Sequence, residues 1–247
     1  GITTTYGYVD GAGNTTTALV SSVNNGGDVW SYEYDAVGNI TKVYRNGELR
    51  QSYAYDSLNQ LARVNDKDTN ATYYYFYDNG GNLVKKSTHI YTTEAAPPAP
   101  YSTIIYEYGD TGWKDLLTKY NGQTITYDTI GNPLQYRDGM SFTWQNGRQL
   151  STLTKGSDVV SYTYNGDGIR TSKTVNGVTT EYTLDDGGTI VAETKNGKTI
   201  LYYFDDAGTR FGFRYDNADY FYVFNLQGDV IGILNSTGSR IVSYTYD

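Results

Sequence analysis

The sequence predicts an all-β protein: a long antiparallel meander of hairpins that curls into a spiral shell or a broad barrel-like wall. Tyr and Gly each supply 28 of the 247 residues, a composition that favours strands separated by turns. A Tyr-x-Tyr-Asp unit recurs about every twenty residues, and a fixed period of this size indicates a repetitive architecture. Apolar stripes with the helical period are not found, so the repeats are expected to consist of strands.

The first part of each repeat is a strand that carries two aromatic rings on one face, because side chains alternate with a period of two. The successive units are Tyr32–Asp35, Tyr53–Asp56, Tyr75–Asp78, Tyr106–Gly109, Ile125–Asp128, Phe142–Gln145, Tyr162–Asn165, Tyr182–Asp185, Tyr202–Asp205, Tyr222–Asn225 and Tyr244–Asp247. We therefore interpret residues 1–247 as a single array of about a dozen units.

Most of these strands are followed by a turn that begins with Asp. Examples are 35–39, 78–82 and 128–132, each reading Asp-x-x-Gly-Asn. An Asp that opens a turn can accept hydrogen bonds from backbone N–H groups ahead of it, while Gly supplies the positive φ that closes the loop. A short alternating strand follows, such as Ile40–Tyr44.

A second kind of turn, usually Asn-Gly, ends that short strand. It occurs at 46–47, 121–122, 146–147, 176–177 and 196–197. Asn-Gly between alternating runs predicts a hairpin with a type I′ turn, since both turn residues need positive φ. Each unit is then two strands and two turns, which gives roughly two dozen strands whose accumulated twist curls the sheet.

Two places depart from the period. The step from Asp78 to Gly109 is too long, and the excess falls near 92–100, where three prolines predict a surface insertion or a functional binding loop. The first unit, Tyr6–Asn14, has one extra residue and predicts a β-bulge.

The predicted site residues are structural ones: ring pairs that build the wall, and Asp, Asn and Gly residues that fix its turns. They are Tyr32, Tyr34, Asp35, Gly38, Asn39, Tyr53, Tyr55, Asp56, Tyr75, Tyr77, Asp78, Gly81, Tyr127, Asp128, Gly131, Tyr162, Tyr164 and Gly168. Catalytic, cofactor-binding and metal-binding residues are not predicted.

The units resemble the RHS or YD repeat, whose consensus runs Tyr-x-Tyr-Asp-x-x-Gly-Asn/Arg-Leu-x. Residues 32–40 and 75–83 fit it closely, and 53–61 fits with Asn-Gln in place of Gly-Asn. Phe142–Leu150 resembles the aromatic variant near the C-terminal end of such arrays, and 164–171 resembles another late unit.

The resemblance implies a coiled β-sheet shell around a cavity, as in bacterial RHS toxins, insecticidal toxin complexes and teneurins. It also implies a secreted or cell-surface bacterial protein whose partners are the rest of the shell and a C-terminal effector. Because Gly1 opens directly into repeat-like sequence and Asp247 stops inside a repeat, we expect a fragment. The Asp-Pro-x-Gly closing segment of the family's self-cleaving site does not occur in the sequence, so we expect neither that site nor the effector in this chain. A fragment cut from such a shell exposes an unpaired strand edge at each end, and we expect these edges to pair between copies of the chain.

Charge and composition narrow the alternatives. The net charge of −8 argues against a nucleic-acid-binding surface, and no apolar run is long enough to insert into a membrane. Cysteine is absent, which excludes thiol catalysis and Cys-based zinc sites. We expect no cofactor.

Few groups are candidates for chemistry. His89, with Ser87 or Ser102 as nucleophile, lacks a Gly-x-Ser-x-Gly elbow and is expected to face solvent. The pairs Asp185-Asp186 and Asp205-Asp206 are expected to serve as turn residues, although a glycosidase or a calcium site would also use carboxylates.

The sequence therefore favours a non-enzymatic segment of an encapsulating toxin shell. The alternative is an adhesion or carbohydrate-binding module that uses exposed aromatic rings, with Trp30, Trp113 and Trp144 as first candidates.

Overall fold

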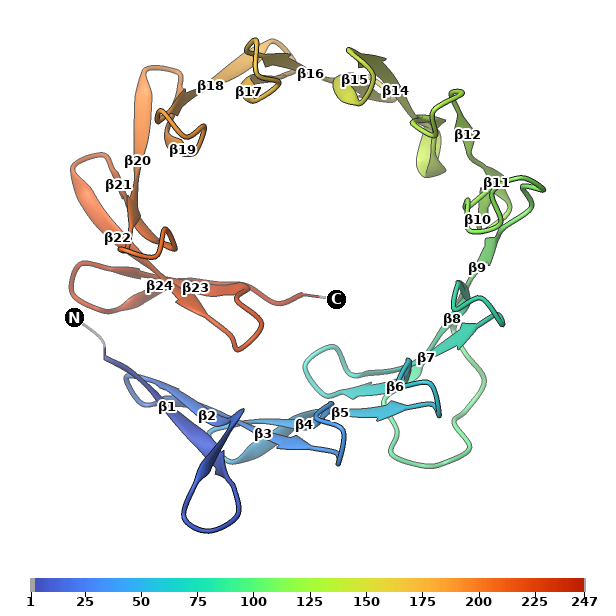
Figure 1. Cartoon of the computed structure of the whole chain (residues 1–247), viewed down its shortest axis with the longest axis vertical. Coiled ribbons are helices and arrows are strands. Elements are labelled where there is room, and N and C mark those ends of the chain that lie inside the picture. Colours follow the sequence, from blue (N-terminus) through green and yellow to red (C-terminus); the bar gives the residue numbers. More distant parts are fainter. Residues whose placement is uncertain (1–2, 247) are drawn as a thin grey trace. The chain divides into compact units, whose positions relative to one another are not determined.

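The computed structural model describes residues 3–246 and is built of β-strands joined by turns, with one 3-10 turn at Arg137–Gly139. Two compact units divide the chain after Gly122, and we call them the N-terminal and the C-terminal unit. Consecutive strands are neighbours throughout each sheet, which confirms the predicted antiparallel meander. Each sheet twists and curves along its length (Figure 1).

The first sheet contains eleven strands. They are β1 (Thr4–Asp10), β2 (Thr16–Asn25), β3 (Asp28–Tyr34), β4 (Ile40–Arg45), β5 (Glu48–Tyr55), β6 (Leu61–Asp66), β7 (Ala71–Tyr77), β8 (Leu83–Ile90), β9 (Ser102–Glu107), β10 (Lys119–Tyr120) and β11 (Gln123–Thr124).

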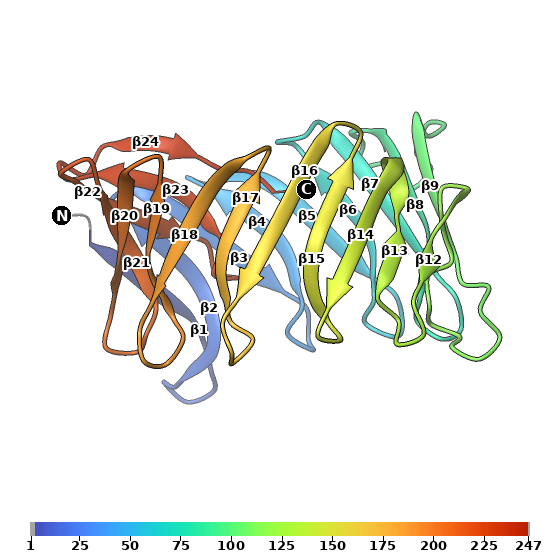
Figure 2. The ribbon, with the colours of Figure 1, turned by 90° about the horizontal axis from the view of Figure 1, so that it is seen from above.

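The second sheet contains thirteen strands, and Figure 2 shows β14 to β18 lying side by side. They are β12 (Thr126–Tyr127), β13 (Pro133–Gln135), β14 (Met140–Gln145), β15 (Gln149–Lys155), β16 (Asp158–Tyr164), β17 (Arg170–Val175), β18 (Val178–Leu184), β19 (Ile190–Lys195), β20 (Lys198–Phe204), β21 (Arg210–Tyr215), β22 (Ala218–Phe224), β23 (Val230–Asn235) and β24 (Arg240–Ser243).

Almost every hairpin that closes through an Asp-x-x-Gly turn, or its Asn equivalent, contains a register shift between its two strands. It falls within the Tyr-x-Tyr strand, as between Glu33 and Tyr34, between Ala54 and Tyr55, and between Thr163 and Tyr164. The extra residue of such a bulge increases the local twist. The predicted bulge in the first unit is confirmed by shifts between Gly7 and Tyr8 and between Tyr8 and Asp10, while the sequence did not reveal that the other repeats have one too.

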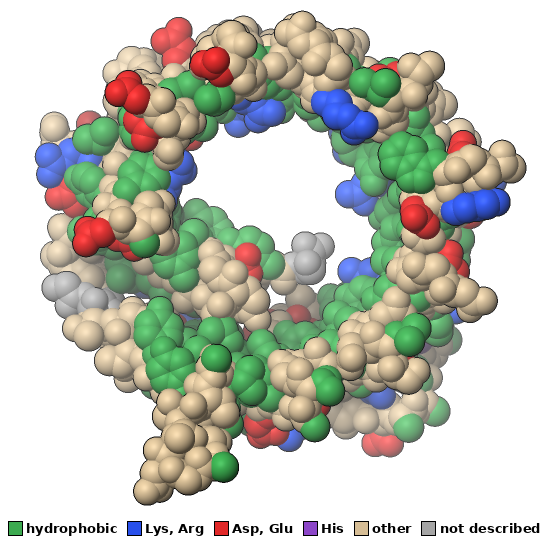
Figure 3. All heavy atoms as spheres, viewed as in Figure 1, with side chains coloured by type: hydrophobic (Ala, Val, Ile, Leu, Met, Phe, Trp, Pro, Cys, Tyr) green, Lys and Arg blue, Asp and Glu red, His purple; other side chains and the backbone are tan. Residues whose placement is uncertain are grey.

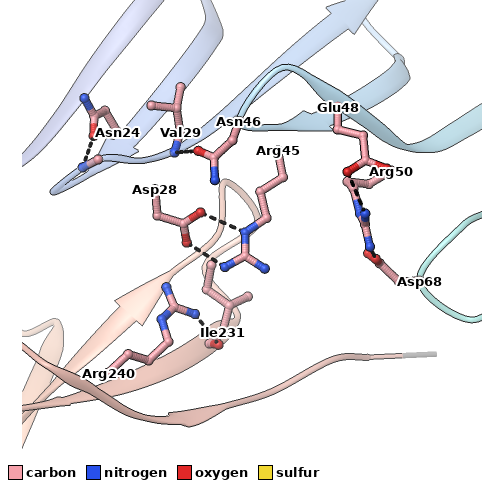
Figure 4. A network of polar contacts seen from close by, with 11 residues as sticks. Asn24, Asp28, Val29, Arg45, Asn46, Glu48, Arg50, Asp68, Ile231 and Arg240 are labelled. Carbon is pink, nitrogen blue, oxygen red and sulfur yellow. Dashed lines mark hydrogen bonds and ion pairs between the residues drawn. The ribbon is translucent and has the colours of Figure 1, made fainter.

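The Asn-Gly turns adopt the predicted conformation, with positive φ at both residues. Asn46 and Gly47 have φ of 52° and 80°, and Asn176 and Gly177 have 49° and 82°. The Asn side chain also bonds the strand that precedes its hairpin: the Val29 N–H of β3 donates to Oδ1 of Asn46, in the turn between β4 and β5, over 2.8 Å (Figure 4). In the C-terminal unit, the Val159 N–H donates to Asn176 in the same way over 2.8 Å.

The wall is one sheet thick, and burial is correspondingly shallow. A compact protein of 27.5 kDa exposes roughly 11,000 Å², whereas this chain exposes 14,890 Å². Hydrophobic side chains remain visible along both sheets (Figure 3). The few fully buried ones include Val23, Val43 and Val64, which oppose aromatic rings on neighbouring strands. Contact between adjacent repeats is therefore the main source of stability.

The Pro-rich segment 91–101 connects β8 to β9 and carries no strand. Its ends are fastened by backbone hydrogen bonds, from Tyr91 N to Asn70 O over 3.2 Å and from Tyr101 N to Thr88 O over 2.9 Å.

Within the described part of the chain, no helix could cross a membrane.

Candidate functional site

The Asp that opens each turn holds the loop by side-chain hydrogen bonds. Oδ1 of Asp35 accepts the N–H groups of Val37 (3.0 Å) and Asn39 (2.8 Å), and its Oδ2 accepts the Asn39 side-chain amide over 2.9 Å. The two bonds to Oδ1 recur at Asp56, Asp78, Asp128, Asp185 and Asp205. The bond from an Asn side chain to Oδ2 recurs at Asp78 and Asp128. The acceptor chemistry expected of Asp is therefore used inside the turn itself.

These bonds favour the ionised carboxylate. At Asp78 the Asn82 side-chain amide, followed by the N–H groups of Asn82, Gly80 and Gly81, lowers the pKa below the usual 3.8. Asn replaces Asp at 165, 225 and 235 and accepts the equivalent N–H groups through Oδ1. The turn thus needs the acceptor and tolerates loss of the charge.

Gly supplies the left-handed residue of these turns, as predicted. The values of φ are 95° at Gly38, 86° at Gly81, 85° at Gly131 and 81° at Gly168. A side chain at these values is strained.

The second aromatic residue of the repeat forms a contact that we call the inter-repeat clasp. The Tyr34 hydroxyl donates to the Val20 carbonyl over 2.7 Å, and the Tyr55 hydroxyl donates to the Ile40 carbonyl over 2.8 Å. The other members are Tyr77 to Leu61, Tyr108 to Leu83, Trp144 to Pro133, Tyr164 to Leu150 and Tyr246 to Val230. Each clasp ties a repeat to a backbone carbonyl in the repeat before it.

At Phe204, where the second aromatic residue has no polar group, an Arg makes the equivalent bond. Phe204 cannot donate, and the Arg210 guanidinium donates to the Ile190 carbonyl over 3.2 Å. Its Cζ lies 3.7 Å from the centre of the Tyr202 ring and 5.5 Å from that of Phe204.

Within each sheet, the first aromatic residues stand on one face, which we call the tyrosine face of that sheet. Tyr32 opposes Val43, Tyr53 opposes Val64 and Tyr75 opposes Lys86 on adjacent strands. Burial raises the pKa of the Tyr53 hydroxyl, which therefore stays protonated. Tyr127 lies in β12 opposite Pro133, and Tyr162 opposes Lys173.

His89 was expected to face solvent, and that expectation is wrong. The side chain is only 6% exposed. Nδ1 lies 2.6 Å from the Pro98 carbonyl, Nε2 lies 3.0 Å from the Ser87 hydroxyl, and the Tyr74 ring meets the imidazole edge-on at 5.2 Å. The segment 91–101 folds back over β6–β8 and covers the ring, an arrangement that short-range sequence patterns do not reveal.

The same segment is held by two further side chains. Thr72 is fully buried, and it donates to the Thr92 carbonyl and accepts from the Thr92 N–H, both over 3.0 Å. Arg63 donates to the same carbonyl over 2.8 Å. The Ser87–His89 pair therefore belongs to a buried polar network beneath the insertion.

The paired carboxylates are placed as turn residues. Asp185 and Asp205 accept turn N–H groups, while Asp186 and Asp206 are exposed. Across residues 3–246, no cluster of three or more metal-ligating side chains occurs.

The three tryptophans occupy different environments. Trp144 serves in a clasp. Trp30 is half-buried, and Cζ of Arg45 lies 5.2 Å from the centre of its indole ring. Nε of Arg45 forms an ion pair with Oδ1 of Asp28 over 2.8 Å. Trp113 is 50% exposed.

Comparison with known sequences places this chain beside long nucleases of Bacillus. It is 34% identical over 200 residues to the tRNA3(Ser)-specific nuclease WapA of Bacillus spizizenii (strain TU-B-10), and equally to the tRNA nuclease WapA of Bacillus subtilis (strain 168). Each match covers 78% of this chain and 8% of the relative, so the chain spans less than a tenth of these proteins. No family model matches the chain.

Comparison with solved structures gives the fold. A TcdB2–TccC3 crystal structure without the hypervariable C-terminal region matches with a TM-score of 0.69 and 17% identity, and that of TcdB2–TccC3–Cdc42 with 0.68 and 18%. Both matches cover all of this chain and 14% of the other. The wall seen here therefore has the fold of a small part of each of these much longer chains.

Proposed function

Because this chain is a run of RHS/YD repeats in sequence and in fold, we propose that it is a non-catalytic wall segment of a secreted bacterial toxin-type protein. Its role is to help enclose a C-terminal effector, as the resemblance to toxin shells implies. The parent protein would be exported or displayed at the cell surface.

The inter-repeat clasp is the observation that supports this role most directly. Seven aromatic side chains donate hydrogen bonds to backbone carbonyls of the wall, and the turn-opening Asp and Asn side chains accept hydrogen bonds from its backbone N–H groups. Such groups hold a shape and are not free to bind a substrate. Nuclease activity, which the names of the WapA relatives carry, would then belong to another part of the parent protein.

Two experiments test the proposal. The 247-residue chain is incubated with total tRNA and a divalent cation, and we expect no cleavage. Cleavage by the folded chain that disappears when the chain is unfolded would contradict the proposal. In the full-length parent, limited proteolysis should spare the C-terminal region until this segment is unfolded or deleted. A C-terminal region digested at the same rate in both forms would refute enclosure.

One observation supports a second function, carbohydrate binding. On the face opposite the tyrosine face, the rings of Tyr203, Phe211 and Phe221 are stacked. The centroids of Tyr203 and Phe211 are 6.0 Å apart with planes at 29°, and those of Phe211 and Phe221 are 6.4 Å apart with planes at 6°. Arg214 and Tyr203 lower the pKa of the neighbouring Asp219 to about 2, so a charged but paired carboxylate borders the rings. Earlier repeats have Thr163 or Thr183 where this one has Tyr203, so the repeat itself does not require the ring.

This second function predicts a neutral glycan as ligand, because rings stack on sugar faces and the adjoining charges are balanced. A glycan array on the wild-type chain should show hits that Phe211→Thr abolishes. Phe211 is 38% exposed, so the substitution should leave the fold intact. An array without hits, or hits that survive Phe211→Thr, would remove this candidate.

A further inference from the structure

The tyrosine face of the C-terminal unit is positively charged although the chain as a whole is acidic. Over β15–β21 this face carries the cations Lys155, Arg170, Lys173, Lys195, Lys198 and Arg210 and the anions Asp158 and Glu193, a net charge of +4. The opposite face of the same strands carries Glu181 and Arg214, which cancel. The acidic residues of this unit lie mostly in its turns.

The two arginines are arranged to present their edges. The Arg170 Cζ lies 4.1 Å from the Tyr162 ring centre, and the Arg210 Cζ lies 3.7 Å from that of Tyr202. A guanidinium group whose face rests on a ring keeps its in-plane N–H donors available, and those donors match a carboxylate. The buried Nε of Arg170 has no hydrogen-bond partner, whereas Nη2 of Arg210 already donates to the Ile190 carbonyl and leaves its other N–H groups for a ligand.

Two lysines add a repulsive contact. Lys195 and Lys198 stand directly opposite each other across an Asn-Gly turn. Like charges at opposite positions destabilise an antiparallel pair. Lys198 forms an exposed ion pair with Asp216 at 3.5 Å, and its Nζ lies 5.4 Å from the centre of the Tyr215 ring. An anion bound between the two ammonium groups would relieve this repulsion.

We propose that the tyrosine face of β15–β21 binds an acidic polypeptide in extended conformation. Arg170 on β17 and Arg210 on β21 are four strands apart, about 19 Å at the usual strand spacing, so a small anion cannot reach both. The guanidinium groups occupy the ring faces on which nucleotide bases would stack, so the surface suits carboxylates better than single-stranded nucleic acid. This partner is additional to the proposed wall role and does not depend on enclosure of an effector.

Fluorescence anisotropy of a labelled peptide of alternating Glu and Ala, titrated with the 247-residue chain, tests the proposal. We expect saturable binding that Arg170→Gln/Arg210→Gln weakens at least tenfold. Arg214→Gln removes one guanidinium from the opposite face and should change the affinity less than twofold. A matched peptide of alternating Lys and Ala should not bind.

A second variant protects the test against misfolding. Lys195→Gln/Lys198→Gln replaces two exposed side chains, so it should leave the fold intact and still bind several-fold more weakly. Glu-Ala binding equal in all variants, no Glu-Ala binding at all, or tighter binding of an oligouridylate than of the peptide would overturn the proposal.

Discussion

The two units build the same hairpin but tie successive repeats in different ways. In the N-terminal unit the second aromatic residue is Tyr, and its hydroxyl donates to a carbonyl of the preceding repeat, as Tyr34 and Tyr55 do. Late in the C-terminal unit this position is Leu184, Phe204 or Phe224, and in the Phe204 repeat Arg210 supplies a hydrogen bond and a ring contact instead. The comparison teaches that the bond to the backbone carbonyl can be kept when the side chain that makes it changes.

The largest effect is expected where one side chain makes several contacts. Arg210→Ala removes a stacked guanidinium and its hydrogen bond to Ile190, and should cost about 2 kcal/mol of unfolding free energy in the C-terminal unit. Urea denaturation measures this, with Arg214→Ala as the control on the other face. An equal loss in both variants would show that the clasp is not special.

A turn that is alike in both units should respond alike. Asn46→Ala and Asn176→Ala each lose a side-chain bond to a cross-strand N–H and place Ala at positive φ, so each should cost about 1–2 kcal/mol. Parallel urea titrations compare them. A difference of more than about 1 kcal/mol between the two would mean that the units differ in more than their clasps.

Removal of a single hydroxyl should have a smaller effect. Tyr55→Phe leaves the Ile40 carbonyl without this donor and should cost about 1 kcal/mol. Phe204→Tyr is the matched control, because Arg210 already bonds the Ile190 carbonyl. If the added hydroxyl stabilised the chain as much as Tyr55→Phe destabilises it, Arg210 would not be a substitute for the Tyr clasp.

The smallest expected effect is the loss of stability at acidic pH, which should occur in turns that begin with Asp and be absent from turns that begin with Asn. Because the folded pKa of Asp78 lies below its unfolded value, its contribution is complete above the unfolded pKa and is lost as the pH falls through the folded pKa. Asp78→Asn should therefore flatten the decline in stability below about pH 4 while changing little at neutral pH. Urea midpoints across this range measure it, and an unchanged acid slope would contradict the role of the carboxylate.

Local patterns were sufficient to predict most of the fold. Alternation predicted the strands, and Asn-Gly at 176–177 and Asp-x-x-Gly at 35–38 predicted the turns, because those conformations depend on a few adjacent residues. The sequence also contains a signal for the clasp that went unused: an aliphatic residue such as Ile40 or Leu61 stands 15 or 16 positions before the Tyr that bonds it.

Other features depended on contacts that sequence spacing does not specify. The burial of His89 requires the insertion to dock on the sheet, and Pro98 is nine residues away along a Pro-rich path. The charge of the tyrosine face was hidden by the net charge of −8, because the cations share one face only after strand register is known.

Amide hydrogen exchange of the triple variant Tyr34→Phe/Tyr55→Phe/Tyr77→Phe, followed by mass spectrometry, tests the clasp most directly. The inter-repeat clasp predicts faster exchange in β2–β8, next to the carbonyls that lose their donors, and unchanged exchange in β14–β23. Unchanged exchange in β2–β8, or equal acceleration in both units, would contradict the claim that these hydroxyls hold the repeats together.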